Sequence, residues 1–224
     1  MKKWFKEYPR YALLPVIITC VYQISFYFLI TFIVKNFPTY SLAIPGIDEN
    51  IPFIPAFIIP YTLSFPFWYI TFFIIGTTEK KHFYNFISMC LIGYTIGFIM
   101  LMVIHGGIER LELDTSNFFE WCLSFMYMMD NPDMGIKLFP SFHVLVSFYI
   151  CVGLFRQKNI HISYRIISII MLVIISLSTV FIKQHYFVDI IAALVLGALT
   201  CFISYRFNLG RFVEKIFERK KETK

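Results

Sequence analysis

Six stretches of predominantly apolar residues constrain this chain more than any other feature of its sequence. They comprise residues 11–34, 61–76, 83–104, 141–155, 166–182 and 185–205. A bilayer core about 30 Å thick requires about 20 apolar residues per helix, and 58% of the chain is hydrophobic while only 15% is charged. The sequence therefore predicts an all-α, polytopic membrane protein with six transmembrane helices, packed as a helix bundle in a single transmembrane domain over residues 1–224.

Composition excludes several other classes of protein. The five cysteines are scattered through apolar stretches, with no CxxC pair and no histidine at ligand spacing. They are interpreted as small apolar side chains, and they predict neither a disulfide framework nor a metal site. The formal net charge of +6 comes from basic residues at the ends of the apolar stretches. In that position they act as topology signals and do not indicate a nucleic-acid partner.

The basic residues are distributed unequally between the two sides that six spans create. Of the 20 Lys and Arg, sixteen fall on the side of the termini and of the 77–82 and 156–165 turns. Nine of the 14 acidic residues fall on the opposite side. This bias predicts a multi-pass protein of the cell membrane with both termini in the cytoplasm. Residues 206–224 form a basic tail with the spacing of a short amphipathic helix, which suits a cytoplasmic anchor on anionic lipid.

Two long connections, residues 35–60 and 105–140, lie on the outer side. Long loops usually carry function, so any chemistry is expected to face outward. Within the first of them, residues 51–60 are apolar but contain three prolines, which remove backbone donors and prevent a continuous span. This segment either lies in the membrane interface or forms an irregular lead-in to the second span.

His185 and Asp189 begin the sixth apolar stretch, four residues apart. This spacing places both side chains on one helical face, where the carboxylate can accept a proton from one imidazole nitrogen. The other nitrogen then keeps its lone pair, as a nucleophilic or basic histidine requires. A purely structural pair that closes the helix end is the alternative, because a carboxylate in an apolar region needs a partner.

His143 lies at the start of the fourth apolar stretch, after Pro140 and Ser141. Proline and serine at this position are typical of a helix N-terminus. The fourth and sixth stretches both direct their N-termini outward, so their free backbone N–H groups favour an anion such as phosphate. A histidine at a helix start is often only a cap. Beside a second histidine with a carboxylate on the same side of the membrane, it is a candidate acid or base.

Two sequence blocks resemble those of the type 2 phosphatidic acid phosphatase superfamily, which includes the vanadium haloperoxidases. Residues 140–143 resemble its PSxH block, and residues 178–189 resemble its SRxxxxxHxxxD block, with the same separation of Ser178, His185 and Asp189. The resemblance covers about residues 45–205. It implies that His185 attacks phosphorus to form a phosphohistidine while Asp189 holds the ring. It also implies that His143 protonates the leaving oxygen and that no metal or other cofactor is required.

The sequence departs from the superfamily pattern where cationic residues are expected. Thr179 replaces the arginine of the SR pair. In the KxxxxxxRP block only Arg110 is matched, with Leu111 in place of proline and Val103 in place of lysine. Because a phosphoryl group in transfer needs cationic donors for its oxygens, we expect Lys183 and Arg110 to replace them. The alternative is that one or both only lie at the level of the lipid headgroups.

Other residues near the two blocks are candidate substrate ligands. Lys137 and Ser141 are expected to bind the phosphate with Lys183 and Arg110. Three further polar residues flank the same blocks and are candidates for headgroup recognition, in no order of preference: Asn131, Asp133 and Tyr186.

A finer resemblance concerns the bacterial relatives of inositol phosphorylceramide synthase. The residues before Asp189, the phenylalanine before the PSxH block, and Asp48 with the apolar block that follows it are similar to that branch. In an enzyme of this type the covalent species carries a phospho-headgroup, and Asp48 and Asp133 are expected to affect the use of the acceptor.

The resemblance implies an integral membrane lipid phosphate phosphatase that acts at the extracytoplasmic face. Its expected substrate is a polyprenyl phosphate or pyrophosphate, phosphatidate or phosphatidylglycerophosphate. The alternative is a phosphotransferase of the inositol phosphorylceramide synthase type, which moves a phospho-headgroup between lipids. A third hypothesis is a lipid-binding or transport protein that keeps the fold without turnover, because the cationic positions are replaced. A channel is not favoured, since no span carries a central charge or paired helix breaks.

Overall fold

Long helices dominate the computed structural model, which describes residues 8–34, 36–130, 134–136, 139–155, 157 and 159–218. The long helices are α2 (Arg10–Val34), α3 (Ile58–Ile75), α4 (Lys80–Val103), α6 (Phe142–Phe155), α7 (Ile162–Phe181) and α8 (Phe187–Arg206). The shorter elements are η1 (Asp48–Asn50), η2 (Pro55–Phe57), β1 (Gly107–Glu109), α5 (Phe118–Asp130), β2 (Met134–Ile136) and α9 (Gly210–Glu218). The structure is therefore mostly helical, as the apolar stretches predict.

Five helices in the described part of the chain are long and apolar enough to cross a membrane. They are α2, the segment Pro55–Ile75 that joins η2 to α3, α4, α7 and α8. The remaining predicted span corresponds to α6, an apolar helix of only 14 residues. The prediction of six spans is thus confirmed for five of them.

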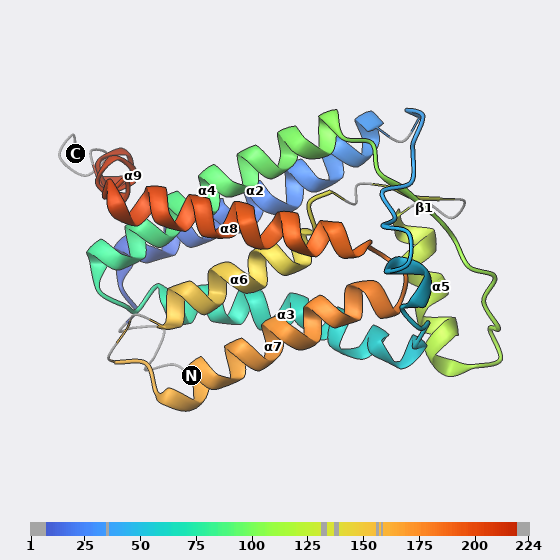
Figure 1. The fold of residues 1–224 in the computed structure, drawn as a ribbon. Coiled ribbons are helices and arrows are strands. Elements are labelled where there is room, and N and C mark those ends of the chain that lie inside the picture. The colour runs from blue at the N-terminus through green and yellow to red at the C-terminus, as the bar shows by residue number, and fades with distance from the viewer. Residues whose placement is uncertain are drawn as a thin grey trace.

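The short helix α6 lies inside the bundle. Ten of its 14 residues are buried, and it contacts α3, α4, α7 and α8. Figure 1 shows it between these helices, with α2 alongside α4. Because side chains of other helices surround α6, its apolar residues are covered by protein rather than by lipid.

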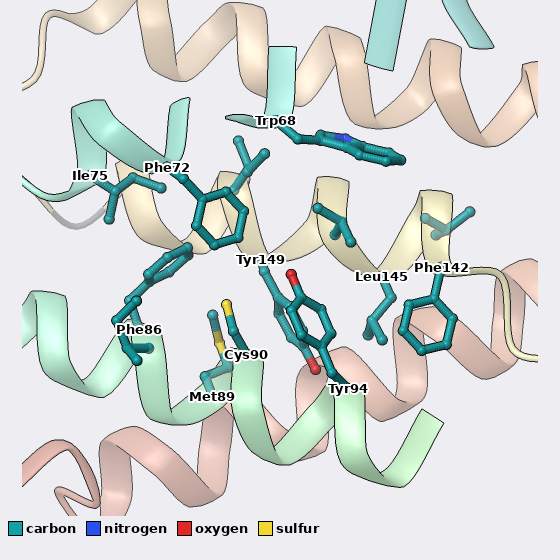
Figure 2. Close-up of a cluster of buried hydrophobic side chains, with 14 of the residues drawn as sticks. Trp68, Phe72, Ile75, Phe86, Met89, Cys90, Tyr94, Phe142, Leu145 and Tyr149 are labelled. Atoms are coloured by element: carbon teal, nitrogen blue, oxygen red, sulfur yellow. The ribbon is translucent and has the colours of Figure 1, made fainter. Parts of the chain in front are cut away.

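Aromatic side chains from α3, α4 and α6 fill the core of the bundle (Figure 2). Trp68 and Phe72 of α3 are each 1% exposed, and the indole N–H of Trp68 donates to Ser147 of α6 over 2.9 Å. A Cβ on Gly93 of α4 would lie 1.7 Å from the hydroxyl of Tyr149, so this glycine lets α4 and α6 approach closely. This packing holds the whole length of α6 in a fixed position.

The two ends of the bundle differ in what covers them (Figure 1). At one end α9 packs on α2 and α4, and Tyr11 donates to the carbonyl of Thr78 over 3.1 Å. At the other end the two long connections meet. The N–H of Tyr40 donates to the carbonyl of His105 over 3.1 Å, and the N–H of Gly107 donates to the carbonyl of Tyr40 over 3.0 Å. There β1 and β2 pair antiparallel, with Gly107 opposite Ile136.

The apolar segment at residues 51–60 packs against protein. Ile54 N–H donates to the carbonyl of Phe181 over 2.9 Å, and the rings of Phe57 and Phe181 lie 4.8 Å apart. The helix α5 covers the same segment. These contacts favour the irregular lead-in to the second span, and location in the membrane interface stays a prediction.

Candidate active site

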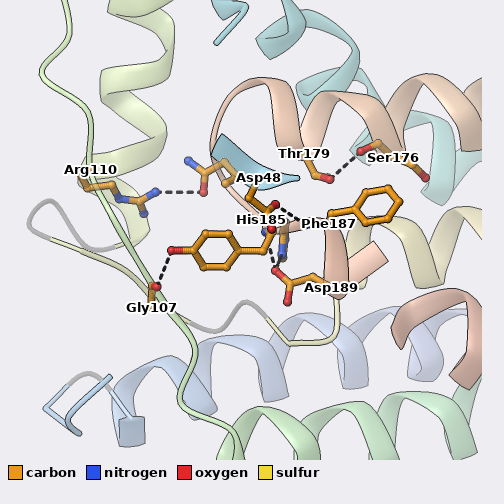
Figure 3. Close-up of polar contacts among 10 residues, drawn as sticks. Asp48, Gly107, Arg110, Ser176, Thr179, His185, Phe187 and Asp189 are labelled. Carbon is orange, nitrogen blue, oxygen red and sulfur yellow. Dashed lines mark hydrogen bonds and ion pairs between the residues drawn. The ribbon is translucent and has the colours of Figure 1, made fainter. Parts of the chain in front are cut away.

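His185 and Asp189 form a buried pair at the start of α8. His185 Nδ1 lies 3.2 Å from Asp189 Oδ2, and the two residues are 8% and 0% exposed. The same oxygen accepts the backbone N–H of Tyr186 over 2.8 Å, so Asp189 also caps the helix. The predicted contact is present (Figure 3). With Nδ1 directed at the carboxylate, Nε2 is the nitrogen that can react.

His143 of α6 lies on the same end of the bundle as His185. The centroids of the two imidazole rings are 6.3 Å apart. Tyr61 of α3 stacks on His143 at 4.1 Å and 24°, and Phe65 and Trp68 contact the same ring at 5.4 and 5.1 Å. These three aromatic rings fix the plane of the His143 ring, and their contacts with it were not predicted from the sequence.

A backbone hydrogen bond joins the start of α6 to the start of α8. The N–H of Ser141 donates to the carbonyl of Asp189 over 3.2 Å, and Ser141 is fully buried. The two motif blocks are therefore in direct contact, as their resemblance to the superfamily implies. This contact keeps His143 and His185 on neighbouring helix starts.

Several buried polar atoms at this end have no hydrogen-bond partner among the described residues, and four of them belong to the two motif blocks. These four are Ser141 Oγ, His143 Nε2, Gln184 Nε2 and Asp189 Oδ1. Buried polar groups in native proteins are nearly always satisfied, so a cluster of exceptions marks a place where a polar ligand or water fits. Ser141 and Gln184 can donate to phosphate oxygens, whereas the second oxygen of Asp189 needs a donor.

Lys183 lies in the turn between α7 and α8 with a positive φ of 52°. Its ammonium donates to the carbonyls of Asp48 and Ile51 over 3.2 and 2.5 Å. Burial lowers the pKa of this ammonium below its ordinary value, and the Asp48 carboxylate opposes that shift. Lys183 therefore holds the 48–51 segment against the turn that precedes His185.

Arg110 contacts the site by a hydrogen bond to Gln184. Its Nη1 donates to Gln184 Oε1 over 3.2 Å (Figure 3). Its guanidinium lies 4.1 Å from the centroid of the Tyr127 ring of α5. Gln184 directly precedes His185, so this hydrogen bond links Arg110 to the segment that carries the candidate nucleophile. Lys137, Asn131 and Asp133 lie outside the described residues.

Thr179, which occupies the position of the superfamily arginine, is fully buried. Its hydroxyl donates to the carbonyl of Ser176 over 2.7 Å. Its own carbonyl accepts from the N–H groups of Gln184 and His185 over 2.9 and 3.0 Å. This residue therefore folds the turn that carries His185 and has no hydroxyl proton to offer a phosphate.

Asp48 binds the start of α8 from the first long connection. Its two carboxylate oxygens accept from the N–H groups of Phe187 and Ile44 over 2.8 and 2.7 Å. Together with Asp189, it occupies the N–H groups of Tyr186 and Phe187. The prediction of free N–H groups for phosphate at the sixth stretch is therefore wrong for these two, because carboxylates of the protein already take them.

A pocket of about 410 Å³ lies beside Tyr186, the residue that follows His185. Its walls come from both long connections and from the start of α8: Thr39, Tyr40, Ser41, Gly107, Ile108, Glu109 and Tyr186. The Tyr186 hydroxyl accepts from Ser41 over 3.0 Å and donates to the Gly107 carbonyl over 3.2 Å. Only Tyr186 was expected near the site from the sequence, because the other walls are distant in the chain.

Comparison with known families agrees with this geometry. The sequence model of the PAP2 superfamily matches residues 117–212, which include both motif blocks, α6, α7 and α8. No curated protein and no solved structure matches the chain. The match supports the superfamily resemblance and, because members are phosphatases and phosphotransferases, an enzyme that processes phosphate esters.

Proposed function

We propose that this protein is a membrane phosphatase that hydrolyses a lipid phosphate through a phosphohistidine on His185. The observation that carries the proposal is the buried His185–Asp189 pair at 3.2 Å, which lies opposite a second histidine with a ring separation of 6.3 Å. An oriented nucleophile and a separate acid/base group are what a two-step displacement at phosphorus requires.

In the first step His185 Nε2 attacks phosphorus, and the bond from phosphorus to the lipid oxygen breaks. His143 donates a proton to that leaving oxygen, while Asp189 holds Nδ1–H and stabilises the positive ring. In the second step water attacks the phosphohistidine and gives a proton to His143. The bond from phosphorus to Nε2 breaks, and free phosphate leaves with His185 restored.

Donors for the phosphate oxygens come from three directions. Ser141 Oγ and Gln184 Nε2 are buried and without partners among the described residues, which supports a role as neutral donors. Arg110 polarises Gln184 from the other side and supplies the nearest described positive charge along that chain of contacts. The start of α6 adds its helix dipole. In this proposal Lys183 supports the wall of the site, and Lys137 remains a further candidate ligand.

The proposed topology has six passes, with α6 as the sixth span enclosed by its neighbours. Both termini face the cytoplasm, and the site faces outward. The described basic residues support this orientation, since most of them lie at the end that carries α9: Arg10, Lys80, Lys81, Arg165, Arg206, Arg211 and Lys215. The short length of α6 is compatible with a span because α3, α4, α7 and α8 surround it.

The test is phosphate release in detergent from phosphatidate, phosphatidylglycerophosphate and undecaprenyl pyrophosphate. We expect one substrate to be hydrolysed by the wild type and by His105→Ala, which removes a histidine from the same end. His185→Ala and His143→Ala should lose activity by at least a hundredfold. Rapid quenching under alkaline conditions should trap a phosphoprotein in the wild type and none in His185→Ala. Full activity in His185→Ala would overturn the proposal.

Phosphotransfer is the second candidate function, and the pocket beside Tyr186 favours it. The first step is shared with hydrolysis, because the same phosphohistidine forms. In the second step an alcohol attacks in place of water. A wild type that consumes the lipid phosphate without releasing phosphate, and that phosphorylates an added alcohol, would support transfer of the inositol phosphorylceramide synthase type.

A further inference from the structure

The pocket beside Tyr186 has walls that are fixed by hydrogen bonds between separate segments. Tyr40 N–H donates to His105 O over 3.1 Å, and Gly107 N–H donates to Tyr40 O over 3.0 Å. The Tyr186 hydroxyl then connects Ser41 to Gly107. The pocket is therefore built from three segments held in register, and its shape does not depend on a single loop.

The volume of the pocket exceeds what a phosphoryl group needs. At about 410 Å³ it falls in the range of sites for small organic molecules, about 300–1,000 Å³. Tyr186 follows His185 in the chain, and its N–H is bound to the same Asp189 oxygen that contacts the His185 ring. The pocket is therefore connected to the candidate nucleophile through Tyr186 and Asp189.

The chemistry of the walls selects among small molecules. Hydroxyl groups come from Thr39, Tyr40, Ser41 and Tyr186, a carboxylate comes from Glu109, and no described wall residue is Lys or Arg. A carboxylate repels a second phosphate, and it accepts strongly from alcohol O–H groups. The aromatic faces of Tyr40 and Tyr186 can cover the C–H surface of a ring or carbon chain.

We propose that this pocket binds a neutral polyhydroxyl compound, such as glycerol, inositol or a sugar, as the alcohol that accepts the phosphoryl group. The role as acceptor rests on the proposed phosphohistidine, whereas binding of the polyol does not. In the transfer step an alcohol oxygen attacks phosphorus and its proton passes to His143. The bond from phosphorus to His185 Nε2 breaks, so a phosphorylated polyol leaves and His185 is restored.

Binding is tested separately from chemistry by ligand-observed nuclear magnetic resonance on purified His185→Ala, which cannot turn over. The probes are myo-inositol, glycerol, glucose and choline. We expect saturation transfer to at least one polyol and none to choline. Glu109→Gln in the same background should weaken polyol binding about tenfold, as expected for loss of one charged hydrogen bond. Glu112→Gln, an exposed carboxylate of the same connection outside the pocket, is the matched control.

Transfer is tested with the wild type, a lipid phosphate and the polyol that binds. We expect a phosphorylated polyol, and Ser41→Ala and Glu109→Gln should lower the ratio of transfer to hydrolysis several-fold relative to Glu112→Gln. No polyol binding in the folded protein, preferential binding of choline, or equal binding by Glu109→Gln would overturn the pocket proposal. Polyol binding in a protein that never forms a phosphohistidine would refute the proposed function and the acceptor role. The proposal that the pocket binds a polyol would still hold.

Discussion

Tyr61 lies almost parallel to the ring of His143, with 4.1 Å between the two centroids and 24° between the planes. The two residues belong to different helices, so the position of α3 sets the orientation of a side chain on α6. Tyr61 is 5% exposed and also belongs to the small apolar cluster under α5. An imidazole that must deliver a proton in one direction benefits from a fixed plane.

We expect Tyr61→Phe to keep activity within about threefold of the wild type, because the stacked ring remains. Tyr61→Leu should lower kcat about tenfold or more, since an aliphatic side chain fills space without fixing the plane of His143. The measurement is steady-state phosphate release together with the melting temperature. Equal kcat for the Leu and Phe variants would show that the stack does not position His143.

Asp48 is expected to matter mainly for stability. Asp48→Ala removes the carboxylate that accepts hydrogen bonds from the N–H groups of Ile44 and Phe187, so both groups lose this acceptor. Hydrogen bonds to charged groups contribute about 1.5–3 kcal/mol each, so for the two bonds we expect a loss of about 3–6 kcal/mol in the free energy of unfolding.

The neighbouring Glu49 is exposed and provides the matched control. Glu49→Ala should change stability by less than about 0.5 kcal/mol. Thermal unfolding of the three proteins in one detergent gives the comparison. An Asp48→Ala protein as stable as Glu49→Ala would contradict the structural role of this carboxylate.

The stability of the protein should depend on pH through Lys183. Burial lowers the pKa of its ammonium in the folded state below 10.5, so the unfolded chain binds this proton more tightly. The folded state is therefore favoured as the pH rises through the folded pKa towards 10.5, and this advantage is lost as the pH falls again. Lys183→Met removes the titration.

The measurement is the melting temperature of the wild type and of Lys183→Met from about pH 8 to about pH 10.5. The difference between them should shift in favour of the wild type as the pH increases. A constant difference, or a shift in favour of Lys183→Met, would show that the folded pKa is not lowered. Both proteins share every other titrating group, so their difference isolates residue 183.

The attachment of α9 should depend on Asn85 more than on Lys80. The N–H of Gly210 donates to Asn85 Oδ1 over 2.9 Å in a buried position. Lys80 forms ion pairs with Glu214 and Glu218 at 2.9 and 2.7 Å, but its side chain is 41% exposed. Exposed ion pairs contribute about 0–1 kcal/mol, whereas a buried group left without its partner costs about 1–3 kcal/mol.

Hydrogen exchange of the backbone across α9 measures this difference. We expect Asn85→Ala to accelerate exchange there by about tenfold or more, and Lys80→Met to change it by less than about fivefold. Lys81→Met, at an exposed neighbouring position, is the control. A larger effect from Lys80 than from Asn85 would place the main attachment at the surface.

The long helices were predictable because the hydrophobic effect acts on continuous apolar stretches. For example, residues 83–104 were expected to span, and α4 covers Lys80–Val103. The length of α6 was predicted equally well, but whether 14 residues cross a bilayer depends on which helices surround them. The helix α5 was not identified, because its residues lie within a long connection and its apolar face is completed only by contacts with Ile58, Tyr61 and Ile182.

At the candidate site, the contact between His185 and Asp189 was predictable because four residues make one turn of helix. Contacts between distant segments have no such rule. The bond between Asp48 and Phe187 joins residues 139 positions apart, and the stack of Tyr61 on His143 depends on how α3 and α6 pack. The contacts of Lys183 were likewise not predictable, because its ammonium binds carbonyls of the distant residues Asp48 and Ile51.

The bond from Ser141 N–H to the Asp189 carbonyl has a consequence for biogenesis. A ribosome delivers α6 to the membrane well before α8, so His143 enters the bilayer while its partner segment is still being synthesised. Until the last long helix arrives, the start of α6 lacks this hydrogen bond, and His185, the proposed nucleophile, is absent. Under the proposed mechanism, activity therefore coincides with complete insertion, and a chain truncated before α8 is expected to carry out no premature chemistry on lipids.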